Sequence, residues 1–463
     1  MRGLKVAFLW SSFFLMNMSV LASDGVLDTT FHSPDGYVLW DGGAGYDRGR
    51  DIALQSDSKI LVTGYMTNGT DNDLMVIRFN SNGTLDAGFG TNGAYIYDGG
   101  NGNDDGYAIA VQSDNKILLA GDSSNGSDGD VLVLRLDTDG KLDPDFGSNG
   151  IFTFDSGSGG DGAIDLLVQS DGDIVICGYS SNGTDNDLLV MRLNANGALD
   201  TTFGSNGLAV YDGGGSQDFG LRLTVQNDGK ILVAGSSDDG SNEDILIARF
   251  NTSGTLDASF GTGGIVLYDG GDYDRGYGID TNSNGNILVT GIRTQPNPNN
   301  TDYDIPVICF DSDGNLDTSF GNNGIVLFDG GNREECYDLM VQSDDTILVA
   351  GHSGNSAAGP SDWSIVVLKY DPDGALDTTF GTGGVYEYDP TENTEWGYGL
   401  ALQSDGKIVV AGQAHNGTDD DVIVLRLTNS TGDIIEPNEP NEPNESNEPT
   451  GPSDPNNYLP VIF

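Results

Sequence analysis

Short apolar runs alternate with turn-forming segments along most of the chain. Between Ala94 and Leu136 there are four such runs, at 94–97, 107–112, 116–121 and 131–136. They are separated by stretches such as Ser-Asn-Gly-Ser-Asp-Gly and Asp-Thr-Asp-Gly. Runs of this length that are bounded by turn residues are typical of β-strands. The pattern therefore predicts four strands in this segment and an all-β protein.

The same four-strand unit recurs along the chain. The segment Leu-Asp-x-x-Phe begins at Leu27, Leu85, Leu142, Leu199, Leu256, Leu316 and Leu376, with steps of 58, 57, 57, 57, 60 and 60 residues. Four strands per unit at a fixed period of this length indicate propeller blades. The series starts with an outer strand at 37–40 and ends with a third strand at 422–427. We therefore predict a seven-bladed β-propeller of four-stranded blades, closed by an N-terminal outer strand that completes the last blade.

The repeated motifs resemble a known family. The unit with its Leu-Asp-x-x-Phe-Gly-x-x-Gly segment is similar to the delta-60 repeat, and Ile-Ala-Val-Gln-Ser-Asp-x-Lys-Ile-Leu-Leu-Ala-Gly resembles the inner hairpin of NHL-type blades. The resemblance covers residues 26–433, and His32 departs from it where the other copies have Gly. It implies a propeller fold and a domain of unknown function.

The two ends of the chain differ from the repeats. Residues 1–23 carry a basic start, an apolar run and a small-residue cleavage pattern, which predicts a secretory signal peptide cut after Ala22 or Ser23. The propeller is expected to occupy 24–435. Residues 436–457 are rich in Pro, Asn and Glu and predict a disordered linker, followed by a short apolar tail at 458–463. We expect a secreted or cell-surface monomer with no membrane span in the mature chain.

The charge balance limits the partners. The formal net charge is −52, with 71 acidic residues against 19 Lys and Arg. This excludes nucleic acid as a partner, because phosphate binding requires a basic surface. The basic residues recur at one repeat position, where we expect them to pair with Asp in adjacent turns: Arg78, Arg135, Arg192, Arg249, Lys369 and Arg426, with Cys309 in blade five. Cys177, Cys309 and Cys336 are expected to be buried, with a Cys309–Cys336 bridge as the alternative.

Ring closure turns repeated acidic positions into rings on one face. Acidic residues precede every inner strand, follow every outer strand, and begin six of the seven third strands, with Ser364 as the exception. One interpretation is that these residues only form turns. The other is calcium, which takes oxygen ligands from crowded carboxylates. The candidate ligands are Asp47, Asp104, Asp161, Asp218, Asp274, Asp73, Asp130 and Asp187.

The blades differ most on the acidic face. Blade five has a longer loop at 293–303, blade six has a longer loop at 352–363, and the next crossing carries Glu and Trp in place of Asp-Gly-Gly. Functional residues are often carried on loops held by a rigid scaffold. The candidate ligand-binding residues are Trp363, Trp396, Glu395, Glu392, His352, Arg293 and Tyr303. A purely structural role for the two Trp residues is the alternative.

These features favour a noncatalytic scaffold that binds an extracellular protein or glycan with the help of Ca²⁺. No nucleophile motif such as Gly-x-Ser-x-Gly is present, and no catalytic residue is assigned. One alternative is a hydrolase or lyase that acts on a saccharide at the central channel mouth, using Glu395 with Asp47 or Glu334. The other is a structural spacer on the cell surface.

Overall fold

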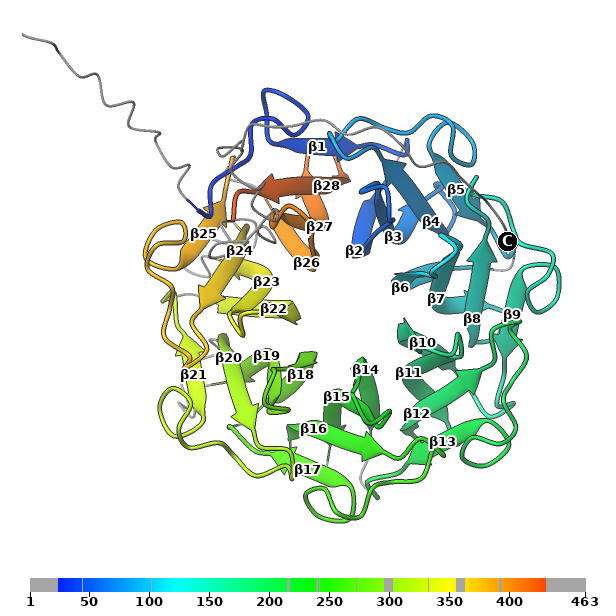
Figure 1. Ribbon diagram of the computed structural model, residues 1–463. Coiled ribbons are helices and arrows are strands. Elements are labelled where there is room, and N and C mark those ends of the chain that lie inside the picture. Colours follow the sequence, from blue (N-terminus) through cyan, green and yellow to red (C-terminus); the bar gives the residue numbers. More distant parts are fainter. Residues whose placement is uncertain are drawn as a thin grey trace, which may run out of the picture. The chain divides into compact units, whose positions relative to one another are not determined.

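Seven four-stranded antiparallel sheets form a ring around a central axis (Figure 1). The computed structural model describes residues 24–429 except 44, 101, 215–216, 239, 241, 272, 295–302, 332, 355–362 and 391–393. The described chain contains no helix that could cross a lipid bilayer. The predicted signal peptide, linker and apolar tail, together with the last residues assigned to the propeller, lie outside the described residues.

Each blade presents its strands in the predicted order from the centre to the rim. The inner strands are β2 (Asp47–Leu54), β6 (Asp104–Val111), β10 (Asp161–Val168), β14 (Asp218–Val225), β18 (Asp274–Thr281), β22 (Arg333–Val341) and β26 (Glu395–Leu402). The second strands are β3 (Ile60–Thr67), β7 (Ile117–Ser124), β11 (Ile174–Ser181), β15 (Ile231–Asp238), β19 (Ile287–Thr294), β23 (Ile347–Gly354) and β27 (Ile408–His415).

The outer half of each blade is built from a third strand and a short rim strand. The third strands are β4 (Asn72–Phe79), β8 (Gly129–Leu136), β12 (Asn186–Leu193), β16 (Glu243–Phe250), β20 (Tyr303–Phe310), β24 (Trp363–Tyr370) and β28 (Asp420–Leu427). The outer strands are β5 (Ala94–Tyr97), β9 (Ile151–Phe154), β13 (Leu208–Tyr211), β17 (Ile265–Tyr268), β21 (Ile325–Phe328), β25 (Val385–Tyr388) and β1 (Tyr37–Trp40).

The ring closes through the first strand, as predicted. Strand β1 pairs antiparallel with β28, with Tyr37 opposite Leu425 and Trp40 opposite Val422, so the last sheet runs β1-β28-β27-β26. Each of the other six sheets is built from four strands that are consecutive in sequence. The N-terminal strand therefore ties the two ends of the propeller together and leaves no blade incomplete.

The core lies between neighbouring blades. One apolar cluster joins Leu61, Leu74 and Phe89 of the first blade to Ile109 and Ile117 of the second. The Phe of the repeated motif is at most 3% exposed in all seven copies: Phe31, Phe89, Phe146, Phe203, Phe260, Phe320 and Phe380. A single blade could not bury these faces alone, so adjacent blades stabilise each other.

The face that carries the Leu-Asp-x-x-Phe turns is held by repeated ion pairs, as expected. The Arg135 Nε atom lies 2.8 Å from Asp143 Oδ2, and its guanidinium lies over the ring of Phe146. Arg135 also donates to the carbonyl oxygen of Ala195 in the next blade at 2.6 Å. The same acid-base pair recurs as Arg78–Asp86, Arg192–Asp200, Arg249–Asp257, Lys369–Asp377 and Arg426–Asp28.

The cysteines contribute to packing only. Cys177, Cys309 and Cys336 are all free and buried, so the alternative of a bridge between the last two is wrong. The thiol of Cys336 instead lies 2.8 Å from the hydroxyl of Thr290 and 3.1 Å from the carbonyl oxygen of Gly291. Burial raises the pKa of the Cys336 thiol above its usual range, which keeps it protonated.

Candidate functional site

The three tiers of acidic residues meet at the junctions between blades. Because successive strands run in opposite directions, the start of each third strand and the end of each outer strand lie on the same face as the starts of the inner strands. Three carboxylates come together at five junctions, each offering one oxygen within 4.8 Å of the others: Asp41–Asp47–Asp421, Asp73–Asp98–Asp104, Asp187–Asp212–Asp218, Asp244–Asp269–Asp274 and Asp304–Asp329–Glu334. We call these five groups the junction clusters.

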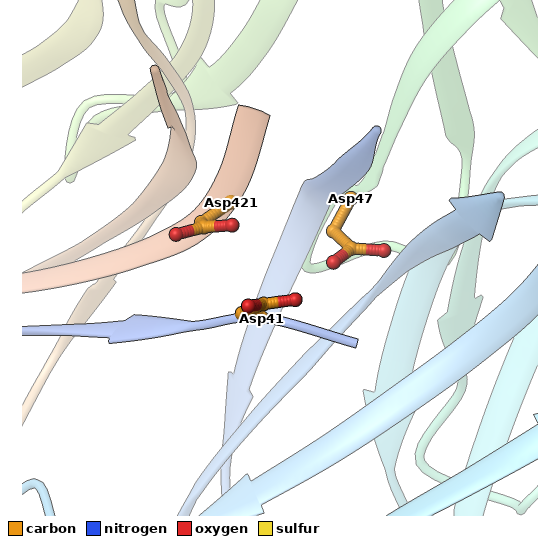
Figure 2. A group of neighbouring side chains, drawn as sticks. All are labelled: Asp41, Asp47 and Asp421. Carbon is orange, nitrogen blue, oxygen red and sulfur yellow. The ribbon is translucent and has the colours of Figure 1, made fainter. Parts of the chain in front are cut away.

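Each junction cluster takes residues from two neighbouring blades. In the cluster of Figure 2, Asp421 comes from β28 and Asp41 follows β1, so both belong to the last blade, whereas Asp47 begins the inner strand β2 of the first blade. The inner member is buried and the outer-strand member is exposed in all five clusters. A cation held here would therefore contact two blades at once.

The carboxylates also form turns, so both interpretations of the acidic rings have a structural basis. Asp98 accepts a hydrogen bond from the Gly100 backbone at 2.7 Å, and Asp104 accepts one from Gly99 at 2.6 Å through Oδ2. The Oδ1 atoms of Asp104 and Asp73 are buried and have no hydrogen-bond partner. The same is true of the Oδ1 atoms of Asp218 and Asp274 in two further clusters. One oxygen thus serves the turn, and the other is left for a ligand.

Crowding and burial disfavour the charged form of the inner carboxylates. Burial raises the pKa of Asp47 from 3.8 to about 7, and Asp41, Asp421 and Asp419 raise it further by repulsion. Burial likewise raises the pKa of Asp274 to about 6, and the pKa values of Asp104 and Asp218 are raised for the same reason. A divalent cation would relieve both the repulsion and the burial penalty.

Two junctions differ from the other five. Among the described residues, Asp130, Asp155 and Asp161 do not all come within the distance that defines a junction cluster. Asp130 and Asp161 are thus the two candidate calcium ligands that are not in a cluster. At the other junction, Ser364 stands at the third-strand position where the other six blades carry an Asp.

The structure gathers four of the predicted ligand-binding residues into one aromatic group. The His352 ring stacks on Trp396 at a centroid distance of 4.8 Å and meets Trp363 edge-on at 4.7 Å. Arg333 links this group to Tyr303, with its guanidinium 4.1 Å from that ring centroid. His352 is buried, and burial lowers its pKa to about 3, so the imidazole is neutral at physiological pH. We call His352, Trp363, Trp396, Tyr303 and Arg333 the aromatic group.

Of the remaining predicted residues, the structure describes Arg293 and Glu395. Arg293 donates to the Gly270 carbonyl oxygen at 2.8 Å, and Glu395 is buried at the start of β26. Glu392 lies outside the described residues. The acids suggested for catalysis do not form one group, since Asp47 clusters with Asp41 and Asp421, and Glu334 belongs to a different junction.

A further set of residues lines the top of the central channel. Each inner strand has an acidic residue near its start. In every blade, the residue that follows this acidic residue is the cross-strand partner of a residue on the second strand. The seven pairs are Arg48–Tyr65, Asp105–Asp122, Gly162–Tyr179, Phe219–Ser236, Arg275–Ile292, Glu335–His352 and Trp396–Gln413. We call these pairs the channel mouth. No two pairs are alike, although the strands around them repeat closely. Alignment of the seven repeats could have revealed them.

Below the channel mouth, one arginine crosses the centre of the ring. Arg222 of β14 lies 3.6 Å from Asp165 of β10, 3.6 Å from Asp338 of β22 and 3.9 Å from Asp51 of β2. These strands belong to four different blades, so the contacts meet on the axis. This Arg222 group occupies the centre of the ring.

Comparison with known proteins supports the fold. A family model described as "Domain of unknown function (DUF5122) beta-propeller" matches residues 55–89, 112–146, 169–203, 226–260, 283–320, 342–380 and 403–433. No curated protein shows significant similarity to the chain.

Several solved structures are similar to this chain. The polysaccharide lyase Uly1 is 12% identical with a TM-score of 0.50, covering 84% of this chain and 91% of its own. A catalytically inactive virginiamycin B lyase from Staphylococcus aureus, solved with quinupristin, is 12% identical with a TM-score of 0.47, covering 84% and 99%. Drosophila Plexin A in complex with Semaphorin 1b is 10% identical with a TM-score of 0.43, covering 87% of each chain. At these identities the likeness extends to the fold alone.

Proposed function

The chain belongs to the DUF5122 beta-propeller family, and from this premise we propose that it is a secreted, noncatalytic propeller that binds an extracellular protein or glycan with the help of calcium. The junction clusters hold the ions and stiffen the acidic face. The partly exposed members of the aromatic group and the channel mouth, such as Trp363, Trp396 and Arg48, contact the ligand. The observation that carries the proposal is the recurrence of three carboxylates at five blade junctions.

Calcium suits the junction clusters better than magnesium. Calcium accepts six to eight oxygen ligands in a flexible geometry, whereas magnesium requires a near-ideal octahedron and keeps several waters. Each cluster offers three carboxylates and adjoins turns rich in backbone carbonyls, such as Asp98-Gly99-Gly100. Zinc is disfavoured because the clusters contain neither His nor Cys.

The first test is a thermal melt of the full chain in EDTA, in calcium and in magnesium. Ions that bind only the folded state raise its stability by linkage, so calcium should raise the melting temperature by several degrees and saturate. Magnesium should have a much smaller effect. Identical melts in calcium and EDTA would show that the carboxylates only form turns.

A matched pair of variants assigns the ions to the junction clusters. In Asp98→Asn a cluster loses one charge, while the amide oxygen can still accept the hydrogen bond from Gly100. Asp389→Asn makes the same change where Ser364 has already replaced one acid. Titration calorimetry should count five calcium ions for the wild type and for Asp389→Asn, and four for Asp98→Asn. Equal counts in all three proteins would contradict the assignment.

One observation favours a second candidate, a hydrolase or lyase that acts on a saccharide. Asp105 and Asp122 are cross-strand partners at the channel mouth, and burial together with the nearby Asp105 raises the pKa of Asp122 to about 7. Two carboxyl groups with different pKa values can act as acid and base. Such an enzyme would release new sugar ends from a bound oligosaccharide, whereas a binding protein would return it intact.

A further inference from the structure

Arg50 is unusual among the basic residues of this acidic chain. It lies on the inner strand β2, partly buried. No carboxylate of the described residues lies within ion-pair distance of its guanidinium, and no described residue forms a hydrogen bond with it; its Nε atom is shielded from solvent without a partner. By contrast, Arg222 has three carboxylates within 4 Å. A partly buried cation with no carboxylate in ion-pair contact is costly, which points to an anion supplied from outside.

Aromatic rings from three blades surround Arg50. Its guanidinium carbon lies 4.8 Å from the ring centroid of Tyr398, 5.6 Å from that of Tyr65 and 6.0 Å from that of Tyr107. These tyrosines come from the last blade, the first blade and the second blade, respectively. The rings hold the guanidinium by cation–π contacts and leave its donor N–H groups without an acceptor.

The neighbours of Arg50 extend this environment to the channel mouth. Arg48, two residues earlier on β2, lies 5.8 Å from the ring of Trp396 and has one distant carboxylate, Asp420, at 3.7 Å. Its Nε atom also has no partner. On the side of Arg50 that belongs to the second blade, Asp105 and Asp122 are cross-strand partners. Two arginines, several aromatic rings and two hydrogen-bond acceptors thus lie close together in one part of the channel mouth.

We propose that the part of the channel mouth formed by the last, first and second blades binds a carboxylated saccharide. Arg50 pairs with the carboxylate, and Arg48 supports this contact. Trp396 is partly exposed and offers a flat face for a sugar ring, and Asp105 and Asp122 accept hydrogen bonds from hydroxyl groups. The inference rests on the proposed binding function, because it names the ligand class. The Arg222 group closes the channel below, so the saccharide enters from the acidic face.

The mixed charge of the mouth selects a saccharide over an acidic peptide. A uronate carries hydroxyl donors beside its carboxylate, so Arg50 can take the carboxylate while Asp105 and Asp122 take the hydroxyl groups. An acidic peptide side chain offers no such donors and would be repelled by the two Asp residues. The aromatic walls also suit sugar rings, which present apolar C–H faces.

The test uses the full chain in calcium and titration calorimetry with three tetrasaccharides: tetragalacturonate, tetraguluronate and the neutral galactotetraose. At least one uronate should bind with a dissociation constant below 1 mM, and the neutral sugar should bind at least ten-fold more weakly. Arg50→Gln should weaken uronate binding at least ten-fold, and Arg50→Lys should weaken it less, because lysine keeps the charge but loses the planar fork. The matched control is Lys230→Gln, which removes one positive charge on the opposite face, where Lys230 is paired with Asp257 at 3.2 Å.

The outcomes separate this inference from the proposed function. The inference is overturned if neither uronate binds, if the neutral sugar binds equally well, or if Arg50→Gln and Lys230→Gln behave alike. Binding of galactotetraose alone would leave a glycan-binding propeller without carboxylate recognition. The calcium count of Arg50→Gln should remain at the wild-type value, which shows that the variant is folded. If calcium did not raise the melting temperature of the wild type, this result would instead contradict the calcium part of the proposed function.

Discussion

The two faces of the propeller obey different rules. On the face that carries the Leu-Asp-x-x-Phe turns, six blades repeat one unit in which a cation pairs with an Asp and lies over a Phe. At the channel mouth, the inner and second strands carry seven different pairs of residues. The repeated unit holds the blades together, so the residues on the other face are free to vary.

The largest effect is expected from removing a repeated aromatic residue. Phe146 is fully buried in the cluster between the second and third blades. Phe146→Ala should lower the free energy of unfolding by about 3–5 kcal/mol, through lost burial and the cavity that remains. Denaturant unfolding measures this cost. The folded variant should keep its saccharide affinity.

The matched change at the channel mouth should behave in the opposite way. Trp396 is larger than Phe146 but only partly buried. Trp396→Ala should cost less stability than Phe146→Ala and should weaken saccharide binding. If Trp396→Ala cost as much stability, or if Phe146→Ala alone removed binding, the division between a structural face and a binding face would be wrong.

A smaller loss is expected where the repeated unit closes the ring. Asp28 precedes the first strand, and its Oδ2 atom lies 2.8 Å from Arg426 Nη2 near the end of the last one. Both residues are buried, so Asp28→Asn should cost about 3 kcal/mol by leaving Arg426 poorly compensated. The control is Asp405→Asn, which removes an exposed partner of Lys407 and should cost less than about 1 kcal/mol. Equal costs would mean that closure is not stabilised by this pair.

The sequence was sufficient for the architecture because repetition fixes it. The period predicted the number of blades, the closing outer strand and the pairing of Arg78 with Asp86, since each is a local or repeated feature. The three acidic tiers were also predicted to share a face. Their grouping was not predicted, because it depends on how the outer half of one blade, such as Asp98, packs beside the inner strand of the next, such as Asp104.

The channel mouth could not be derived from local patterns. Arg50 and Tyr398 are far apart in the sequence and meet only because the ring closes. Asp105 and Asp122 are separated by a whole hairpin and become partners through the register of β6 and β7. An individual Arg or Tyr in a strand carries no sign of function. The sign of function is that the residue differs from those at the same position in the other six repeats. This difference becomes visible only when the repeats are aligned residue by residue.

The smallest predicted effect concerns pH and tests the junction clusters directly. The pKa of Asp47 is raised to about 7 in the folded state, so between roughly pH 4 and 7 the folded protein holds a proton that the unfolded chain has lost. In EDTA, stability should therefore decrease as the pH rises through this range. Asp51 and Asp122, with pKa values also raised to about 7, contribute with the same sign.

The variant Asp47→Asn shows how much one junction cluster contributes to the pH dependence of stability. In EDTA, the variant should lose part of the wild-type decrease in stability between pH 5 and 8, a difference on the order of 1 kcal/mol after allowance for solvent screening. In calcium the wild type should regain stability as the pH rises, because the ion binds the deprotonated carboxylates, and the variant should regain less. Denaturant unfolding at several pH values measures both. Parallel pH profiles for the two proteins, with and without calcium, would show that the crowded carboxylates at this junction neither hold the extra proton nor bind the ion.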